Sequence, residues 1–197
     1  MDWHAAAGLA SALVALVATV PYIRAAARRE IRPSAVTWAG WWLFSAVVFA
    51  AQMLSEPSWS AIIAGGGTAY CGVVTVLALR NGGARIGALD AVCGALGLAA
   101  IAAWQASGDP RLALLFTIAG DICLCIPTLA KSIRDPSSEL GGRFLLAAVA
   151  ALIGAAAARH LDFLSLGWPL YLIVANTTIG VVALRARPAR AALAERA

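Results

Sequence analysis

The segment GDICLCIPTLAK, residues 120–131, places a carboxylate and a proline inside one apolar run. Asp121 lies about ten residues into the apolar stretch 111–130, near its middle, where insertion of a carboxylate into a membrane costs roughly 2.5–3.5 kcal/mol. A stretch of about 20 apolar residues has the length that a helix needs to cross a hydrocarbon core of about 30 Å. The segment therefore predicts a membrane helix whose aspartate faces protein or water.

The rest of the chain has the same apolar character. Its 197 residues are 61% hydrophobic and 13% charged, with a mean hydropathy of +0.82, which is far from the usual composition of a soluble domain. Seven runs of membrane-spanning length predict helices at residues 4–23, 34–54, 58–79, 86–105, 111–130, 141–158 and 164–184. The fold class expected from these runs is an all-α integral membrane protein with seven transmembrane helices.

The basic residues indicate an orientation in the membrane rather than nucleic-acid binding. The net charge is +5, and 13 of the 15 Lys and Arg residues fall on one side of the predicted topology, whereas Arg111 and Arg159 fall on the other. The positive-inside rule then places the N-terminus outside and the tail 187–197 in the cytoplasm. We expect a multi-pass protein of the cell inner (cytoplasmic) membrane.

The four cysteines predict neither a disulfide framework nor a metal site. Cys71, Cys93, Cys123 and Cys125 all fall inside predicted membrane helices, without the spacing of a zinc site. Buried free cysteine ordinarily serves as a small packing residue. We therefore expect no bound metal and no cofactor.

Two prolines suggest an internal repeat. Pro21 lies near the end of the first predicted helix, before the turn Arg32-Pro33-Ser34, and Pro127 lies near the end of the fifth, before Asp135-Pro136-Ser137. Proline removes a backbone hydrogen bond and weakens a helix. The pair therefore predicts hinges at matching depths, toward the cytoplasmic ends of the two helices.

The repeat predicts a 3+1+3 architecture. A unit of three helices crosses the membrane an odd number of times, so one intervening helix restores the orientation of a second copy. We expect a first triple-helix bundle at residues 1–83, an inverter helix at 84–107 and a second, parallel triple-helix bundle at 108–186. A substrate site would lie between the bundles near the middle of the membrane.

This pattern resembles the SWEET, SemiSWEET and PQ-loop superfamily of small membrane transporters. The resemblance covers nearly the whole chain by topology, and it rests on the two prolines, the Pro-Ser turns and an asparagine in the last helix. The glutamine of a PQ motif is replaced by Tyr22 after Pro21 and by Thr128 after Pro127. The resemblance implies alternating access around the prolines and a central cavity lined by asparagine and tryptophan.

The resemblance also implies a binding position in the last helix. Asn176 occupies the position of the family's binding asparagine, and Thr68 is its counterpart in the third helix when Gly72-Val73-Val74 is aligned with Gly180-Val181-Val182. Thr178 adjoins Asn176 and Tyr70 adjoins Thr68, so an uncharged polar patch at mid-membrane is expected. Hydrogen bonding between helices is the alternative interpretation of this patch.

Other candidate site residues lie in the second and fifth helices. Trp38, Trp42 and Ser45 form part of one stripe, with Trp41 beside it, and Trp41, Trp42 and Ser45 lie deep enough to contact a flat ligand. Packing, or an interfacial position for Trp38, is the alternative. Helical periodicity places Asp121 on one face with Cys125 and Thr128, toward a cavity that the hinge would open. The alternative is a neutral, protonated Asp121 that bonds to a neighbouring helix.

Two further polar residues have other expected roles. Asp90 lies near the start of the fourth helix with Arg85 nearby, which favours a helix cap or an interfacial ion pair. Lys131 is the only lysine, and it lies at the cytoplasmic end of the fifth helix. The absence of lysine from the last helix argues against a retinal-binding photoreceptor, which needs a buried amine for its Schiff base.

Two classes of function remain open. The first is a transporter of a small neutral or weakly charged metabolite, sugar-like or similar, with Asp121 binding substrate or carrying a coupling proton. The second is an enzyme similar to small membrane terpene cyclases, with Asp121 as catalytic general acid and the tryptophans around a carbocation. The matched prolines favour the transporter. The expected partners are a small-molecule substrate and membrane lipids, and a homo-oligomer is an open alternative.

Overall fold

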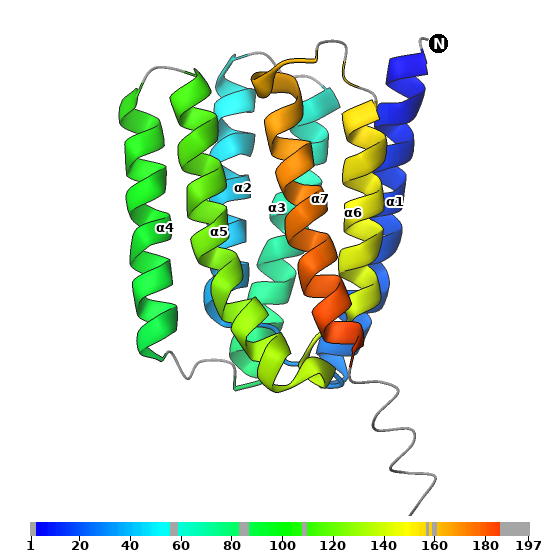
Figure 1. Cartoon of the computed structure of the whole chain (residues 1–197), viewed down its shortest axis with the longest axis vertical. Coiled ribbons are helices and arrows are strands. Elements are labelled where there is room, and N and C mark those ends of the chain that lie inside the picture. The colour runs from blue at the N-terminus through cyan, green and yellow to red at the C-terminus, as the bar shows by residue number, and fades with distance from the viewer. Residues whose placement is uncertain are drawn as a thin grey trace, which may run out of the picture. The chain divides into compact units, whose positions relative to one another are not determined.

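The computed structural model describes residues 3–55, 59–82, 87–107, 110–156, 158 and 161–185, and most of them are helical. Those residues form seven α-helices, one 3-10 helix and no strand: α1 (Trp3–Ala27), α2 (Ala35–Ser55), α3 (Trp59–Arg80), α4 (Ala88–Ser107), α5 (Pro110–Arg134), η1 (Pro136–Ser138), α6 (Gly141–Ala156) and α7 (Phe163–Leu184) (Figure 1). The predicted all-helical class is confirmed, and each α-helix overlaps one predicted apolar run. The expected cytoplasmic tail, 187–197, lies outside the described residues.

Apolar length and exposure indicate association with a membrane. Among the described residues, three helical segments are long and apolar enough to cross a bilayer, Trp3–Ala27, Leu115–Arg134 and Leu166–Leu184, and α6 is apolar but shorter. Large aliphatic side chains on α1 are exposed: Leu9, Leu13, Leu16, Val17 and Val20. Such a surface is suited to lipid rather than water. The arrangement of seven membrane spans stays a prediction.

Local signals explain where several helices begin and end. Ser34 caps α2, because its Oγ accepts a hydrogen bond from the Thr37 backbone N–H at 3.3 Å. Asp90 stabilises the start of α4 from inside the helix, since its Oδ2 accepts at 2.9 Å from the N–H of Gly87, the residue before α4. The cap expected for Asp90 is thus confirmed, and Arg85, the expected ion-pair partner, lies outside the described residues.

The end of α1 is closed by a non-glycine residue in the left-handed region. Arg29 has φ 60°, its N–H donates to the Ala26 carbonyl at 3.1 Å, and the Glu30 N–H donates to the Ala25 carbonyl at 2.9 Å. These two bonds form a Schellman motif, in which glycine usually occupies the position of Arg29. They end α1 after Ala27, about one turn beyond the predicted boundary at residue 23.

The described contacts divide the chain into two compact units. Unit 1 contains residues 1–31 and 128–197, and unit 2 contains residues 32–127. Contacts therefore group α1 with α6 and α7 and divide α5 at Pro127. This grouping differs from a division into residues 1–83, 84–107 and 108–186, which concerns the membrane topology and stays a prediction.

Unit 1 is built around α6, which packs against both α1 and α7. α1 and α7 run in the same direction and α6 runs opposite to them (Figure 1). Ser11 Oγ donates to the Ala150 carbonyl at 2.7 Å, which joins α1 to α6. Glycine is required where α6 crosses α7, because a Cβ on Gly141 would lie 2.8 Å from the Gly180 carbonyl oxygen.

Unit 2 is built around α2, which packs mainly on α3 and also on α4. Gly40 of α2 receives the Leu124 side chain of α5, and a Cβ at that position would overlap the leucine. Trp38 is fully buried in this unit. This burial supports the packing alternative for Trp38, whose indole also meets the Tyr70 ring of α3.

Candidate functional site

Asp121 is a buried carboxylate in the middle of α5. It is 6% exposed, and its Oδ2 lies 3.5 Å from Cys125 Sγ, one helical turn away, which donates a weak hydrogen bond. This contact confirms that the two residues share a face of the helix. A buried carboxylate in an apolar helix costs stability and marks a position where function is the first hypothesis.

The predicted tryptophan stripe separates into a buried and an exposed part. Trp38 makes edge-to-face contacts with Trp41, at 4.9 Å between ring centroids, and with Tyr70 of α3, at 5.2 Å. We call Trp38, Trp41 and Tyr70 the aromatic cluster. Two of the predicted site residues, Trp41 and Tyr70, thus meet on the same tryptophan.

Trp42 lies against α3, whereas Ser45 bonds within α2. Trp42 is 46% exposed, and its Nε1 lies 3.0 Å from the position that a Cβ of Gly72 would occupy. Ser45 Oγ donates to the Trp42 carbonyl at 3.0 Å, within its own helix. Thr68 of α3 is half-buried in the same unit.

The polar residues of α7 bond to their own helix. Asn176 Nδ2 donates to the Leu172 carbonyl at 2.9 Å, and Thr178 Oγ1 donates to the Val174 carbonyl at 2.8 Å. Thr178 is exposed and Asn176 is half-buried. Both belong to unit 1, whereas Asp121 and the aromatic cluster belong to unit 2.

Within the described part of the chain, two buried polar atoms have no hydrogen-bond partner, Trp41 Nε1 and Ser132 Oγ. An unsatisfied buried donor costs free energy, so it often marks a place for a ligand or water. For Trp41 this suits its predicted role in binding. For Ser132 the sequence suggested no role.

The two predicted hinge residues lie inside helices. Pro21 interrupts the hydrogen-bond ladder of α1 and Pro127 that of α5, each within about two turns of the helix end. Tyr22 and Thr128, which follow the prolines, are both fully buried in unit 1. In both helices, the residue directly after the proline is therefore buried in unit 1.

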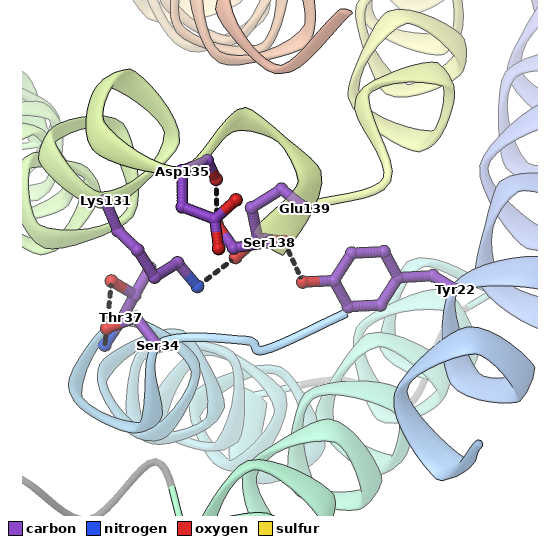
Figure 2. Close-up of polar contacts among 7 residues, drawn as sticks. All are labelled: Tyr22, Ser34, Thr37, Lys131, Asp135, Ser138 and Glu139. Atoms are coloured by element: carbon purple, nitrogen blue, oxygen red, sulfur yellow. Dashed lines mark hydrogen bonds and ion pairs between the residues drawn. The ribbon is translucent and has the colours of Figure 1, made fainter. Parts of the chain in front are cut away.

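A buried ionic cluster lies beyond these prolines, and the sequence interpretation missed it (Figure 2). Glu139, in the connection between η1 and α6, is 2% exposed. Its Oε2 accepts from the Tyr22 hydroxyl at 2.5 Å and its Oε1 from Lys131 Nζ at 2.6 Å. We call Tyr22, Lys131 and Glu139 the ionic cluster.

Little in the sequence could have identified the ionic cluster. Tyr22 and Glu139 are 117 positions apart, so no periodicity relates them. The available signals were the tyrosine that replaces a PQ glutamine after Pro21 and the only lysine of the chain, Lys131, eight positions before Glu139. Neither signal predicts a contact without the fold.

The described residues contain no group of three or more His, Cys, Asp or Glu side chains placed to hold a metal ion. Within unit 2, the aromatic cluster offers an indole N–H and ring surfaces, which suit a small organic ligand with hydrogen-bonding groups, and Asp121 separately offers a carboxylate. Comparisons of the chain with protein-family models, curated proteins and solved structures gave no match. The resemblance to SWEET and PQ-loop transporters therefore rests on the sequence pattern.

Proposed function

We propose that the protein is a membrane transporter for a small neutral or weakly charged metabolite, sugar-like or similar, that works by alternating access. The observation that carries the proposal is the buried Asp121 in an apolar helix long enough to cross a bilayer. Ionisable residues inside membrane helices are rare, and they commonly mark a substrate or proton pathway. The proposal includes seven membrane spans in a 3+1+3 arrangement in the inner membrane, with a cytoplasmic C-terminus.

The prolines support a moving structure. Pro21 and Pro127 lie inside α1 and α5, where each removes a backbone hydrogen bond. The boundary between the compact units falls directly after Pro127. At Pro127 the helix α5 lacks a backbone hydrogen bond and also crosses the unit boundary, and such a position is suited to hinge motion.

The aromatic cluster supports a ligand with hydrogen-bond acceptors. Trp41 presents a buried indole N–H that has no partner within the described residues, beside the ring of Trp38. A hydroxylated solute would supply the missing acceptor and an apolar ring face for stacking. Under this proposal Trp41, Trp42, Ser45, Thr68, Tyr70, Asn176 and Thr178 contribute to substrate binding.

The test is solute uptake into proteoliposomes that contain the full chain, with and without an inward proton gradient. Radiolabelled hexoses, pentoses and small polyols serve as the probe panel. We expect the wild-type protein to accumulate at least one of them and Asp121→Asn to lose gradient-driven accumulation. Asp90→Asn is the matched control, since Asp90 is a half-buried carboxylate that caps the start of α4.

Full gradient-dependent uptake by Asp121→Asn would overturn the proton role, and no protein-dependent uptake of any probe would overturn the transporter proposal. The alternative, a terpene-cyclase-like enzyme, is tested on the same preparations. Polyprenyl substrates are added and cyclic products are sought by mass spectrometry. Products that disappear in Asp121→Asn and persist in Asp90→Asn would favour the enzyme.

A further inference from the structure

Glu139 holds together three segments that are distant in sequence. Its side chain is 0% exposed, and each carboxylate oxygen accepts one short hydrogen bond, from the Tyr22 hydroxyl on α1 and from Lys131 Nζ on α5. A carboxylate buried to this extent is stable only when such partners remain in place. The end of α1, the end of α5 and the connection to α6 are therefore joined at one point (Figure 2).

The backbone that carries Glu139 is itself fixed. Ser138 donates twice to the Asp135 carbonyl, from its N–H at 2.9 Å and from its Oγ at 2.6 Å. Ser137 Oγ donates to Asp135 Oδ1 at 2.6 Å, and Pro136 restricts the first residue of η1. These hydrogen bonds fix the backbone turn that precedes Glu139.

Two residues of α6 contact the ring of Tyr22. The Arg143 guanidinium lies 5.7 Å from the centre of the Tyr22 ring, and Phe144 meets that ring edge-to-face at 6.1 Å. Both contacts restrict the rotation of the tyrosine. Its hydroxyl therefore remains directed toward Glu139.

The partners of Glu139 lie directly beyond the two prolines. Tyr22 follows Pro21, and Lys131 lies about one helical turn after Pro127. A helix segment that follows a proline has lost one backbone hydrogen bond to the preceding turn. In unit 1 the side-chain hydrogen bonds of the ionic cluster join the two segments beyond the prolines to each other.

We infer that Glu139 is a positioning residue that couples the segments beyond Pro21 and Pro127, so that the two hinges move together. The inference rests on the proposed transport function for its purpose, but the coupling is a property of the folded chain. It assigns Tyr22 a role as well: the tyrosine hydroxyl transmits movement from the end of α1 to the carboxylate, and through Lys131 to the end of α5.

The test is hydrogen exchange, followed by mass spectrometry, on the full chain in lipid nanodiscs. Tyr22→Phe removes one hydroxyl from α1 and keeps the ring that packs on Phe144. We expect exchange to rise roughly tenfold in peptides of α1 beyond Pro21 and also in residues 128–134 of α5, the factor that corresponds to a lost hydrogen bond to a charged group. Lys131→Met should have the same effect on both segments, and Lys131→Arg, which keeps the charge and a donor, should restore slow exchange.

Glu30→Gln is the matched control, because the Arg28–Glu30 pair at 3.8 Å is exposed and close to the same end of α1. The coupling is overturned when Tyr22→Phe changes α1 but leaves residues 128–134 as in Glu30→Gln. It is equally overturned when all helices exchange faster together, which would indicate general loss of stability. Hydrogen exchange requires no solute, so it tests the coupling independently of transport. Coupled exchange in a protein that takes up no solute would contradict only the transport proposal. Solute uptake without coupled exchange would contradict only the role of Glu139.

Discussion

Asp121 and Glu139 are both buried carboxylates, but their surroundings differ. Glu139 accepts a phenol and an ammonium hydrogen bond at 2.5 and 2.6 Å from two different helices. Asp121 accepts a thiol hydrogen bond at 3.5 Å from its own helix. Short charge-assisted bonds fix Glu139 to two helices. The comparison sets Glu139, whose bonds join separate helices, beside Asp121, which we propose binds a substrate or a proton.

The largest effect on stability is expected for Glu139→Leu. The substitution leaves Lys131 and the Tyr22 hydroxyl without their acceptor, and loss of one partner from a buried ion pair costs about 3 kcal/mol. That value is at the low end for such pairs because the Lys131 side chain is 26% exposed and can turn toward solvent. Equilibrium unfolding in mixed micelles measures the change in the free energy of unfolding. A loss below about 1 kcal/mol would contradict a structural role for the carboxylate.

A smaller effect is expected for Tyr22→Phe. This variant removes one hydrogen bond to a charged acceptor, which contributes about 1.5 kcal/mol, and it keeps the buried ring and its contacts. The same unfolding experiment measures it. Stability equal to that of the wild-type protein would mean that Lys131 alone satisfies Glu139.

Asp121→Asn should change stability by less than about 1 kcal/mol, because an amide of the same shape replaces the carboxylate and can still accept from Cys125. Its expected effect is on uptake rather than on folding. Unfolding and uptake are therefore measured on the same preparations. A stability loss as large as that of Glu139→Leu would make the two carboxylates equivalent and would remove the distinction between them.

The smallest effect is expected for Glu30→Gln. Arg28 and Glu30 form an exposed pair at 3.8 Å, and surface ion pairs of this kind contribute less than about 0.5 kcal/mol. The unfolding midpoint should shift little, and it should be insensitive to added salt. A loss comparable to that of Tyr22→Phe would show that the stability assay does not distinguish buried from exposed charges.

The helices were predictable from sequence because a membrane helix needs a continuous apolar run of fixed length. The ends were less predictable. α1 continues past Arg24 to a Schellman motif at Arg29, and α5 continues past Lys131 to Arg134, because a helix can extend beyond the apolar region with its charged residues outside it.

The candidate site was only partly accessible from sequence. The burial of Asp121 and its contact with Cys125 follow from helical periodicity, since both residues belong to one helix. The contact of Trp38 with Tyr70 and that of Tyr22 with Glu139 join different helices. Such pairs depend on how the helices pack, which no local pattern in the chain specifies.

The most direct measurement of the proposed division of roles is gradient-driven uptake by Asp121→Asn and Tyr22→Phe, side by side in proteoliposomes of equal protein content. Tyr22→Phe keeps Asp121 and should still accumulate solute when a proton gradient is applied, at an altered rate. Asp121→Asn should show equal uptake with and without the gradient. Accumulation by Asp121→Asn at the wild-type level would contradict the assignment of the working carboxylate to Asp121.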